Sequence, residues 1–484
     1  MPFNELGLTA ELSQALKASA YQRPTAIQVQ SIPVILAGRD VAGTAQTGTG
    51  KTAAFVLPML QRLGASTGKL RALILTPTRE LAVQVEASIR KYGRFTKLRS
   101  TAIYGGVSQK NQEEALKKGV DIIVATPGRF LDLLNQRLLN LSTIEILTLD
   151  EADRMLDMGF LPDIREIVRH VPKERQTLLF TATLPPEVLD LTRSVQSDPV
   201  LIQAGEARTP AAGIDQVFYP VPSHLKNDLL LELLERETMQ PLLVFTKTKH
   251  GADRLHSLLE RRRFKVARIH SGRTQSQRQA ALESFKKSHC PILIATDIVA
   301  RGIDVQNISH VINFDLPNNV DDYIHRIGRT ARAEKVGMAY SFVSPEDEAT
   351  VRLIEKTIRR KLARIRLDGF DYDAPVKSRV SRTEPSVLRQ PFSAERTAPK
   401  NGSPKVFDRF AHGLAAAHRK PRPNGGSDRR PNGKSEWVEG RIGIPSDEER
   451  AELKRLQIKI FGTSNFRRNK PRSSFRTGHT RDRY

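Results

Sequence analysis

Short runs of hydrophobic residues alternate with amphipathic stretches along the first 370 residues. In the first half, four apolar runs predict buried strands, at residues 72–75, 122–124, 146–149 and 177–180. Residues 80–92 repeat apolar side chains at helical spacing, with one face formed by Leu81, Val85, Ile89 and Tyr92. Strands that alternate with amphipathic helices are typical of a parallel sheet covered on both sides, so the pattern predicts an α/β fold.

The second half repeats this rhythm. Its apolar runs predict strands at residues 242–245, 266–269, 292–295, 311–314 and 339–343. A last helix is predicted to begin with Ser344 as its cap, Pro345 in the first turn and Asp347 completing a capping box. We expect its apolar face to be formed by Val351, Ile354, Ile358 and Leu362.

The length of 484 residues favours more than one domain. Residues 204–213 are small, polar and interrupted by Pro and Gly, as in an interdomain linker. We therefore predict domain 1 at residues 1–205, a linker at 206–213, domain 2 at 214–370 and a tail at 371–484. The tail is rich in Pro, Gly, Ser, Asn and Arg, which predicts a largely disordered segment, with one possible short helix at 446–461.

The net charge of +24 indicates a polyanionic partner, although a basic chain can also simply be kept soluble by its charge. Residues 371–484 carry 26 Lys and Arg against 13 Asp and Glu, so over half of the net charge lies in the tail. Near its end, basic residues alternate with Phe466, Phe475 and Tyr484, a pattern that suits single-stranded RNA. A solvated tail without one defined partner is an equal alternative.

Cys290 is the single cysteine, so an intramolecular disulfide is excluded and a reducing compartment is favoured. No apolar run approaches the length of about 18 residues that spans a bilayer, and the N-terminus resembles neither a signal nor a transit peptide. We expect a soluble cytoplasmic protein without a membrane partner.

The first chemical motif is similar to a P-loop and is followed by a predicted helix at 52–63. Gly48 and Gly50 allow backbone N–H groups to surround phosphate oxygens. Lys51 is then placed for the β- and γ-phosphates and Thr52 for Mg²⁺. By itself, a Gly- and Thr-rich turn would share this pattern. The candidate ATP-binding residues are Ala45, Gln46, Thr47, Gly48, Thr49, Gly50, Lys51 and Thr52.

A second motif, Asp150-Glu151, follows the apolar run that ends at Leu149. A P-loop enzyme needs carboxylates at this end of a strand. We expect Asp150 to hold Mg²⁺ and Glu151 to activate or orient the attacking water.

With these residues in place, the sequence 150–153 (Asp-Glu-Ala-Asp) resembles the signature of DEAD-box RNA helicases, and the other family motifs follow in order. The resemblance covers residues 1–370 and implies two tandem RecA-like parallel-sheet domains. It implies adenine recognition by Gln28, with Phe3 as the upstream aromatic residue. In domain 1 it implies RNA contacts by Pro77, Thr78, Arg79, Gly105, Gly106, Thr126, Pro127, Gly128 and Arg129.

In domain 2 the resemblance implies RNA contacts by Thr246, Gln275, Arg278, Thr296, Arg301 and Gly302. It further implies that Arg329 and Arg332 act as arginine fingers and that Asp304 reaches the ATP ribose. Coupling between ATP and RNA is expected from Asp153, Thr181, Ala182, Thr183, His325 and Arg326, the last two near the acidic tetrad.

Two positions depart from the family pattern. Thr181-Ala182-Thr183 stands where Ser-Ala-Thr is usual, which keeps a hydroxyl and adds a methyl group. Ala331 replaces the usual Gly between the finger arginines, and we expect the backbone to accept it only with a negative φ.

The resemblance thus implies an ATP- and Mg²⁺-dependent RNA helicase that closes two domains on single-stranded RNA and unwinds short duplexes or remodels RNA–protein complexes. One alternative is a nucleotide-gated RNA clamp or annealing protein whose tail binds most of the RNA, and a less favoured one is a DNA helicase. Residues 6–8 and 24–28 resemble the family's Q motif, and this early Q motif together with the basic tail resembles bacterial RhlE-type members. Ribosomal precursors or RNA-degradation complexes are candidate partners of the tail.

Overall fold

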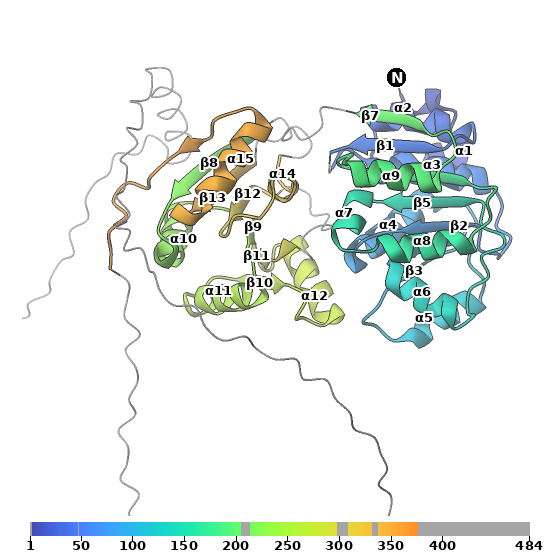
Figure 1. Cartoon of the computed structure of the whole chain (residues 1–484). Coiled ribbons are helices and arrows are strands. Elements are labelled where there is room, and N and C mark those ends of the chain that lie inside the picture. The colour runs from blue at the N-terminus through green and yellow to red at the C-terminus, as the bar shows by residue number, and fades with distance from the viewer. Residues whose placement is uncertain (1, 47, 205–212, 298–307, 332–336, 376–484) are drawn as a thin grey trace, which may run out of the picture. The chain divides into compact units, whose positions relative to one another are not determined.

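The computed structural model describes residues 2–46, 48–204, 213–297, 308–331 and 337–375. They form two α/β domains, each built on a seven-stranded sheet whose strands all run parallel (Figure 1). The predicted linker, apart from Gly213, lies outside the described residues. So does the tail beyond residue 375, including the predicted helix at 446–461.

The sheet of domain 1 confirms the parallel α/β prediction. Its strands, in spatial order, are β3 (Ser100–Ile103), β4 (Ile122–Ala125), β2 (Ala72–Leu75), β5 (Ile146–Asp150), β6 (Gln176–Thr181), β1 (Val41–Ala45) and β7 (Val200–Ala204). The four predicted strands are all present. Strand β1 was not predicted because Gly43 and Thr44 interrupt its apolar character.

Helices cover both faces of this sheet. One apolar core lies under η1 (Phe3–Leu6), α1 (Ala10–Ala18), α2 (Ala26–Leu36), α3 (Lys51–Leu63) and α4 (Arg79–Tyr92). The opposite core packs against α6 (Pro127–Asn135), α7 (Ala152–Asp157), α8 (Leu161–His170) and α9 (Pro186–Val195). Helix α5 (Gln109–Lys117) lies against the edge strand β3. Burial on both faces explains why the central strands read as continuous apolar runs rather than alternating ones.

Domain 2 repeats the strand order of domain 1. Its sheet runs β10 (Val266–Ile269), β11 (Ile292–Ala295), β9 (Leu242–Phe245), β12 (His310–Asn313), β13 (Gly337–Val343), β8 (Ile214–Pro220) and β14 (Ala363–Arg364). Three predicted strands match to the residue, and β12 begins one residue before its prediction. The two domains therefore share one topology, and equivalent loops leave their sheets at equivalent places.

The helices of domain 2 also lie on both faces of its sheet. Helices α10 (Lys226–Arg236), which follows η2 (Ser223–Leu225), and α11 (Lys249–Arg261) pack over one core. On the other side lie α12 (Gln275–Lys286), α14 (Val320–Ile327) and α15 (Glu348–Ile358).

The predicted capping box of Ser344 and Asp347 is present, but it opens a short 3₁₀ turn, η3 (Pro345–Asp347), before α15. The helix ends at Ile358, because Arg359 adopts a left-handed conformation with φ of 55°. Leu362 was thus wrongly placed on the helix, although it is buried in the same core.

The segment after β14 packs onto domain 2 as far as Ala374. The backbone N–H of Leu367 donates to the Tyr372 hydroxyl at 2.7 Å, and the Arg236 guanidinium donates to the carbonyl of Asp368 at 2.6 Å. Residues 371–374 were assigned to the tail, yet they contact the domain.

Within the described residues, none of the helices has both the length and the apolar character to cross a bilayer.

Candidate active site

The carboxyl ends of three adjacent strands bring the nucleotide motifs of domain 1 together. Strand β5 ends at Asp150, whose register partner on β6 is Phe180; Thr181, the next residue of β6, pairs with Thr44 of β1. The P-loop leaves β1 directly after Ala45. Ligands of open parallel sheets bind at this edge, so the fold assembles the three motifs that the sequence separates by about 130 residues.

The P-loop is held in a compact turn by its own side chains. Gly48 and Gly50 have φ values of 83° and 85°, which favour glycine. The Thr49 hydroxyl donates to the carbonyl of Gln46 at 2.7 Å, and helix α3 begins at Lys51. Backbone N–H groups of the turn and the positive end of α3 can therefore receive an anion.

Lys51 folds back over the loop. Its Nζ donates to the carbonyl of Ala45 at 2.6 Å and approaches the carbonyl of Thr181 at 3.4 Å. These two carbonyls belong to neighbouring strands, so the ammonium lies between the P-loop and the motif at the end of β6. Phosphate oxygens would replace neutral carbonyl acceptors with charged ones, which bind an ammonium more strongly.

Gln28 joins the Q motif to the P-loop. Its Oε1 accepts from the backbone N–H of Thr25 at 3.0 Å within a capping box, and its Nε2 donates to the carbonyl of Gly50 at 3.1 Å. A Cβ on Gly50 would collide with this amide. A carboxamide has two N–H donors and two acceptor lone pairs, so Gln28 keeps one of each for a base edge.

Phe3, the predicted upstream aromatic residue, is part of the core of domain 1. Its ring packs edge-on against Tyr21 at a centroid distance of 6.2 Å. Tyr21 is only half-buried, and its hydroxyl is 2.7 Å from that of Tyr92. The sequence did not single out Tyr21.

Asp150 and Glu151 form a concentrated negative site. Burial and the neighbouring Glu151 carboxylate raise the pKa of Asp150 to about 7, and Lys51 offsets them only partly. Glu151 has a φ of 52°, in the left-handed region that non-glycine residues rarely adopt. Its Oε2 has no hydrogen-bond partner within the described part of the chain. Such a pair favours a bound cation and a polarised water.

Asp153 connects the acidic tetrad to the end of β6. Its Oδ2 accepts three hydrogen bonds: from the backbone N–H of Ala182 at 3.2 Å, the backbone N–H of Thr183 at 3.0 Å and the hydroxyl of Thr183 at 3.0 Å. The Thr181 hydroxyl donates to the carbonyl of Thr183 at 2.7 Å. The departure from Ser-Ala-Thr therefore keeps its hydroxyl bonded and places the added methyl group in a fully buried position.

The three RNA-motif candidates of domain 1 leave the same edge of the sheet. Residues 77–79 follow β2, Gly105-Gly106 follow β3, and residues 126–129 follow β4. The Arg79 guanidinium lies against Gly106, where a Cβ would collide with it. Thr126 is the N-cap residue of helix α6, which begins at Pro127, so the N–H groups of its first turn, including that of Gly128, have no acceptor within the helix and lie at this edge of the sheet.

Domain 2 builds an equivalent edge. Thr248 begins α11 with φ and ψ of −129° and 150°, as Thr78 begins α4 with −129° and 152°. Thr246 follows β9, Thr296 follows β11, and Gln275 and Arg278 share one face of the first turn of α12. The predicted residues Thr47, Arg301, Gly302, Asp304 and Arg332 lie outside the described residues.

Arg326 is held entirely by residues of its own domain. Its Nε and Nη2 donate to the two carboxylate oxygens of Asp297 at 2.5 and 2.7 Å. Its Nη1 donates to Oδ1 of Asn313 at 3.1 Å and to the carbonyl of Asp315 at 2.6 Å, and its guanidinium lies 4.9 Å from the Phe245 ring centroid. This network assigns Arg326 a positioning role at the ends of β9, β11 and β12.

Comparison with known proteins identifies the family. Residues 25–191 match the DEAD/DEAH box helicase family, and residues 225–334 match the helicase conserved C-terminal domain. The DEAD-box ATP-dependent RNA helicase CshA of Bacillus licheniformis is 40% identical over 369 residues, which cover 76% of each chain. CshA of Geobacillus kaustophilus is also 40% identical, over 76% of this chain and 79% of that protein. The chain belongs to the DEAD-box helicase family.

Solved structures agree with this assignment. The structure of S. cerevisiae Dbp5 bound to RNA and ADP BeF3 is 33% identical, with a TM-score of 0.71, and covers 76% of this chain and 96% of that one. The DEAD-box helicase Mss116 bound to ssRNA and UDP-BeF is 28% identical, with a TM-score of 0.70 and coverages of 76% and 80%. The two α/β domains are thus RecA-like, as predicted. The closer likeness to RhlE-type members is not confirmed, because the relatives named here are CshA proteins.

One expectation about this DEAD-box chain is wrong. Ala331 has a φ of 55°, so the backbone keeps the left-handed conformation that the usual glycine would adopt. Sequence reasoning also missed Asp297 and Asn313, the partners of Arg326. Asp297 directly follows Thr296, one of the predicted RNA contacts, but no local pattern distinguishes Asn313.

Proposed function

We propose that this DEAD-box protein is an ATP-dependent RNA helicase whose core unwinds short duplexes or remodels RNA–protein complexes. The supporting observation is the shared carboxyl edge of the domain 1 sheet, where Ala45, Asp150 and Thr181 end adjacent strands and the RNA motifs follow β2, β3 and β4. Because the nucleotide motifs and the RNA motifs leave one rigid sheet at the same edge, nucleotide binding at one group of loops can change RNA binding at the other.

ATP binding follows from the geometry of the P-loop. N–H groups of residues 48–52 and the start of α3 receive the phosphates, and the Lys51 ammonium moves from the carbonyl of Ala45 to phosphate oxygens. The free donor and lone pair of Gln28 read the adenine edge.

The described residues hold no group of three or more His, Cys, Asp and Glu side chains that could bind a metal by themselves. Mg²⁺ nevertheless fits, because it commonly uses one or two protein ligands together with substrate phosphates. Asp150 and Thr52 would hold it. Burial, followed by the neighbouring Glu151 carboxylate, raises the pKa of Asp150, and a bound cation would favour its charged form. When bound, Mg²⁺ neutralises charge on the transferred phosphoryl group.

Glu151 is the group we assign to water activation. It directly follows the last residue of β5 in a left-handed backbone conformation, and its Oε2 has no hydrogen-bond partner within the described residues. It orients the attacking water and accepts its proton as the bond to the γ-phosphorus forms and ADP leaves. Arg329 and Arg332 of domain 2 stabilise the charge of the transition state, so turnover requires both domains to meet around the nucleotide.

RNA binding by the core is proposed to be independent of sequence. The contacts are backbone N–H groups, small residues and arginines of the motifs in both domains, which suit phosphates and 2′-hydroxyl groups rather than base edges. Asp153 and residues 181–183 transmit nucleotide state to the RNA motifs, and His325 and Arg326 complete this coupling from domain 2.

The tail and the location remain sequence-based proposals. We propose that basic residues of the tail tether RNA, with ribosomal precursors or RNA-degradation complexes as the candidate assemblies, and that the protein acts in a bacterial cytoplasm.

Steady-state ATP hydrolysis with and without RNA tests the proposal. We expect turnover to rise with single-stranded RNA more than with DNA of the same sequence, and a short RNA duplex to be separated only with ATP. Turnover that RNA leaves at its basal level, or that only DNA stimulates, would contradict it. Lys51→Ala supplies the inactive control.

A further inference from the structure

A basic loop lies at the edge of domain 1 opposite the described motifs. It connects α4 to the edge strand β3, and residues 90–99 contain five Lys and Arg and no Asp or Glu. The motif residues follow the carboxyl ends of the strands, whereas this loop precedes the amino end of β3. Across the four residues of β3 the two ends are roughly 13 Å apart.

The loop presents an aromatic ring among its cations. Phe95 is 43% exposed, whereas Tyr92 and Leu98, on either side of it in the chain, pack in or against the apolar core of the domain. Lys91, Arg94 and Lys97 are exposed on either side of it. Rings that stack on bases, flanked by cations that contact phosphates, are the pattern of single-strand nucleic-acid surfaces.

The cations of this surface are not neutralised by acidic side chains. Across the described ranges of the chain, Lys91, Arg94 and Lys97 form no ion pair with a carboxylate. Arg94 instead donates to the carbonyl of Lys91 at 3.0 Å, and the Lys91 ammonium lies 5.3 Å from the ring centroid of Tyr21. The nearby Glu86 is already paired with Arg90 and accepts from Ser100.

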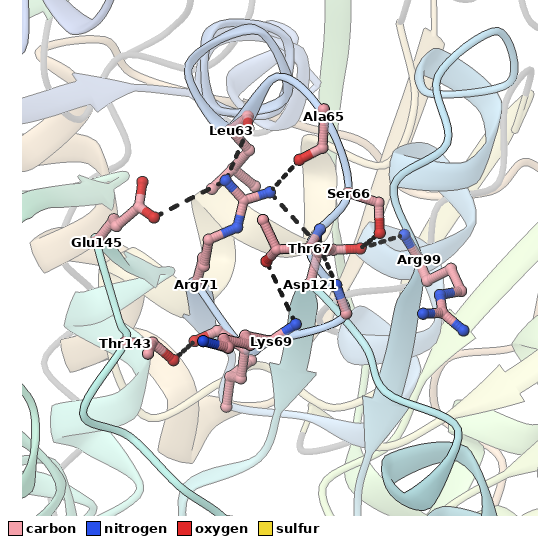
Figure 2. A network of polar contacts seen from close by, with 12 residues as sticks. Leu63, Ala65, Ser66, Thr67, Lys69, Arg71, Arg99, Asp121, Thr143 and Glu145 are labelled. Atoms are coloured by element: carbon pink, nitrogen blue, oxygen red, sulfur yellow. Dashed lines mark hydrogen bonds and ion pairs between the residues drawn. The ribbon is translucent and has the colours of Figure 1, made fainter.

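A buried carboxylate fixes the adjoining loops (Figure 2). Asp121 accepts from the Ser66 hydroxyl at 2.7 Å, the Thr67 N–H at 2.9 Å and the Arg99 N–H at 3.0 Å, and Arg71 lies at 3.5 Å. Burial would raise the pKa of Asp121, but these donors and Arg71 hold it below its ordinary value. The carboxylate thus stays charged, and its negative charge is balanced by these donors and by Arg71 rather than by the exposed cations.

The loops that Asp121 holds in place carry three further cations, Arg99, Lys69 and Lys118. The Arg99 guanidinium points away from Asp121 (Figure 2). It donates to the carbonyl of Lys118 at 2.7 Å. Lys69 and Lys118 are exposed on the two loops that precede β2 and β4. Three neighbouring loops therefore present positive charge from one rigid framework.

The equivalent loop of domain 2 is also basic, but it does not expose an aromatic ring. It carries Arg261, Arg262 and Arg263, of which Arg262 lies 4.0 Å from Glu235. Phe264, the counterpart of Phe95, packs against the core. The two loops are thus both basic, and they differ in the aromatic ring, which is packed in domain 2 and exposed in domain 1. Shared topology alone therefore does not explain the exposed ring of domain 1.

We propose that Lys91, Arg94, Phe95, Lys97, Arg99, Lys69 and Lys118 form an accessory surface for RNA that extends beyond the segment held by the core. Such RNA would leave the motif at Gly105-Gly106 and follow the edge strand β3 to its amino end. The exposed ring favours RNA over an acidic protein segment, which would use the cations alone. The inference rests on RNA being the substrate proposed above.

Binding of the full-length protein to RNAs of about 6 and about 20 nucleotides tests this surface. Arg94→Gln with Lys97→Gln should weaken binding of the longer RNA about fivefold and reduce the slope of log affinity against log salt by about 1.4, since each single-strand phosphate contact contributes about 0.7. Phe95→Ala should weaken the longer RNA with little change in slope. The short RNA should bind as before and stimulate ATP hydrolysis normally.

Arg165→Gln with Lys173→Gln is the matched control, because it removes the same charge from exposed positions near α8. Equal losses in this control and in the Arg94 and Lys97 variant, or equal losses on both RNA lengths, would overturn the accessory surface. So would unchanged RNA binding together with loss of an acidic protein partner. A failure of the proposed function would give a different result, because RNA of either length would then leave ATP hydrolysis by the wild-type protein unchanged.

Discussion

The hydroxyl of Thr183 donates to the carboxylate of Asp153 at 3.0 Å, and the backbone N–H of Thr183 reaches the same oxygen at 3.0 Å. This contact joins the last residue of the acidic tetrad to the loop after β6. Thr181, at the end of that strand, is also close to Lys51, whose Nζ is 3.4 Å from its carbonyl. Lys51 and Asp153 therefore contact the same short segment of backbone, residues 181–183.

Replacing Thr183 tests this coupling. Thr183→Val keeps the shape but removes the hydroxyl, so it leaves Asp153 with two donors instead of three. We expect strand separation per ATP to fall about tenfold, because a hydrogen bond to a charged carboxylate contributes about 1.5–3 kcal/mol. RNA-stimulated ATP hydrolysis should change less than about threefold, because the two backbone donors still hold Asp153. Thr183→Ser should behave as wild type in a parallel unwinding assay. Equal effects of Val and Ser would contradict a role for the hydroxyl.

Glu151 and Lys51 should both be required for turnover, by different routes. Each of Glu151→Gln and Lys51→Ala should lower the rate of ATP hydrolysis at least about 100-fold. Glu151→Gln keeps the P-loop, so it should still bind RNA tightly with ATP, whereas Lys51→Ala should lose the ATP-dependent increase in RNA affinity. The exposed Glu174→Gln is a control that should leave turnover unchanged. ATP-dependent RNA retention by both variants would argue against these roles.

Ala331 should be strained by its left-handed backbone. That conformation costs a non-glycine residue about 1–2 kcal/mol, and the flexibility that glycine adds to the unfolded chain offsets part of this. Ala331→Gly should therefore raise the free energy of unfolding of domain 2 by up to about 1 kcal/mol in urea titrations. Ala280→Gly, at an exposed position inside α12, should lower it by about as much. Destabilisation by both changes would contradict the positive φ.

Arg326 should not tolerate lysine despite the equal charge. Its bidentate contact with Asp297 and its bonds to Asn313 and the carbonyl of Asp315 use a planar fork that an ammonium cannot reproduce. Arg326→Lys should lower the free energy of unfolding by about 3 kcal/mol, since it leaves buried partners unpaired. The exposed Arg352→Lys, beside Glu348, should change it by less than about 0.5 kcal/mol. Comparable melting curves for the two variants would exclude the network as a structural support.

Glu237 should make the stability of domain 2 depend on pH. Burial raises its pKa to about 7, and the Tyr340 hydroxyl, which donates at 3.2 Å, offsets this only partly. The folded domain then keeps a proton that the unfolded chain releases above pH 4.5, so the free energy of unfolding should decrease as pH rises from about 4.5 to about 7. Because Glu237 is partly exposed, we expect a decrease of about 1–2 kcal/mol.

Glu237→Gln should remove most of this decrease, since the amide can still accept from Tyr340 but has no proton to release. Thermal unfolding at pH 5 and pH 8 measures the difference between the two proteins. An equal pH dependence in wild type and variant would show that Glu237 does not carry it.

Local sequence patterns predicted the central strands because those strands are buried on both faces, so nearly every residue in them must be apolar. They did not predict β1, β3, β7, β8 or β14. Strand β1 contains Gly43 and Thr44, and β3 and β7 lie at the edges of their sheet, where partial exposure weakens the pattern. Sequence periodicity also extended the last helix past Ile358, because Leu362 is buried without being helical.

The motifs themselves could be identified from the sequence, because phosphate binding and water activation require particular residues at short, fixed spacings, as in Gly48–Thr52 and Asp150-Glu151. Other features depended on contacts between residues far apart in the chain. Asn313 accepts from Arg326, which lies 13 residues further along the chain. Ala331 keeps a left-handed backbone, and the ring of Phe95 stays exposed although it is apolar. Sequence alone determined which chemistry this chain can perform, because that chemistry resides in local motifs. Only the tertiary structure decided which side chains hold the motifs in place and which surfaces stay open, because the order of strands in the sheet sets those contacts.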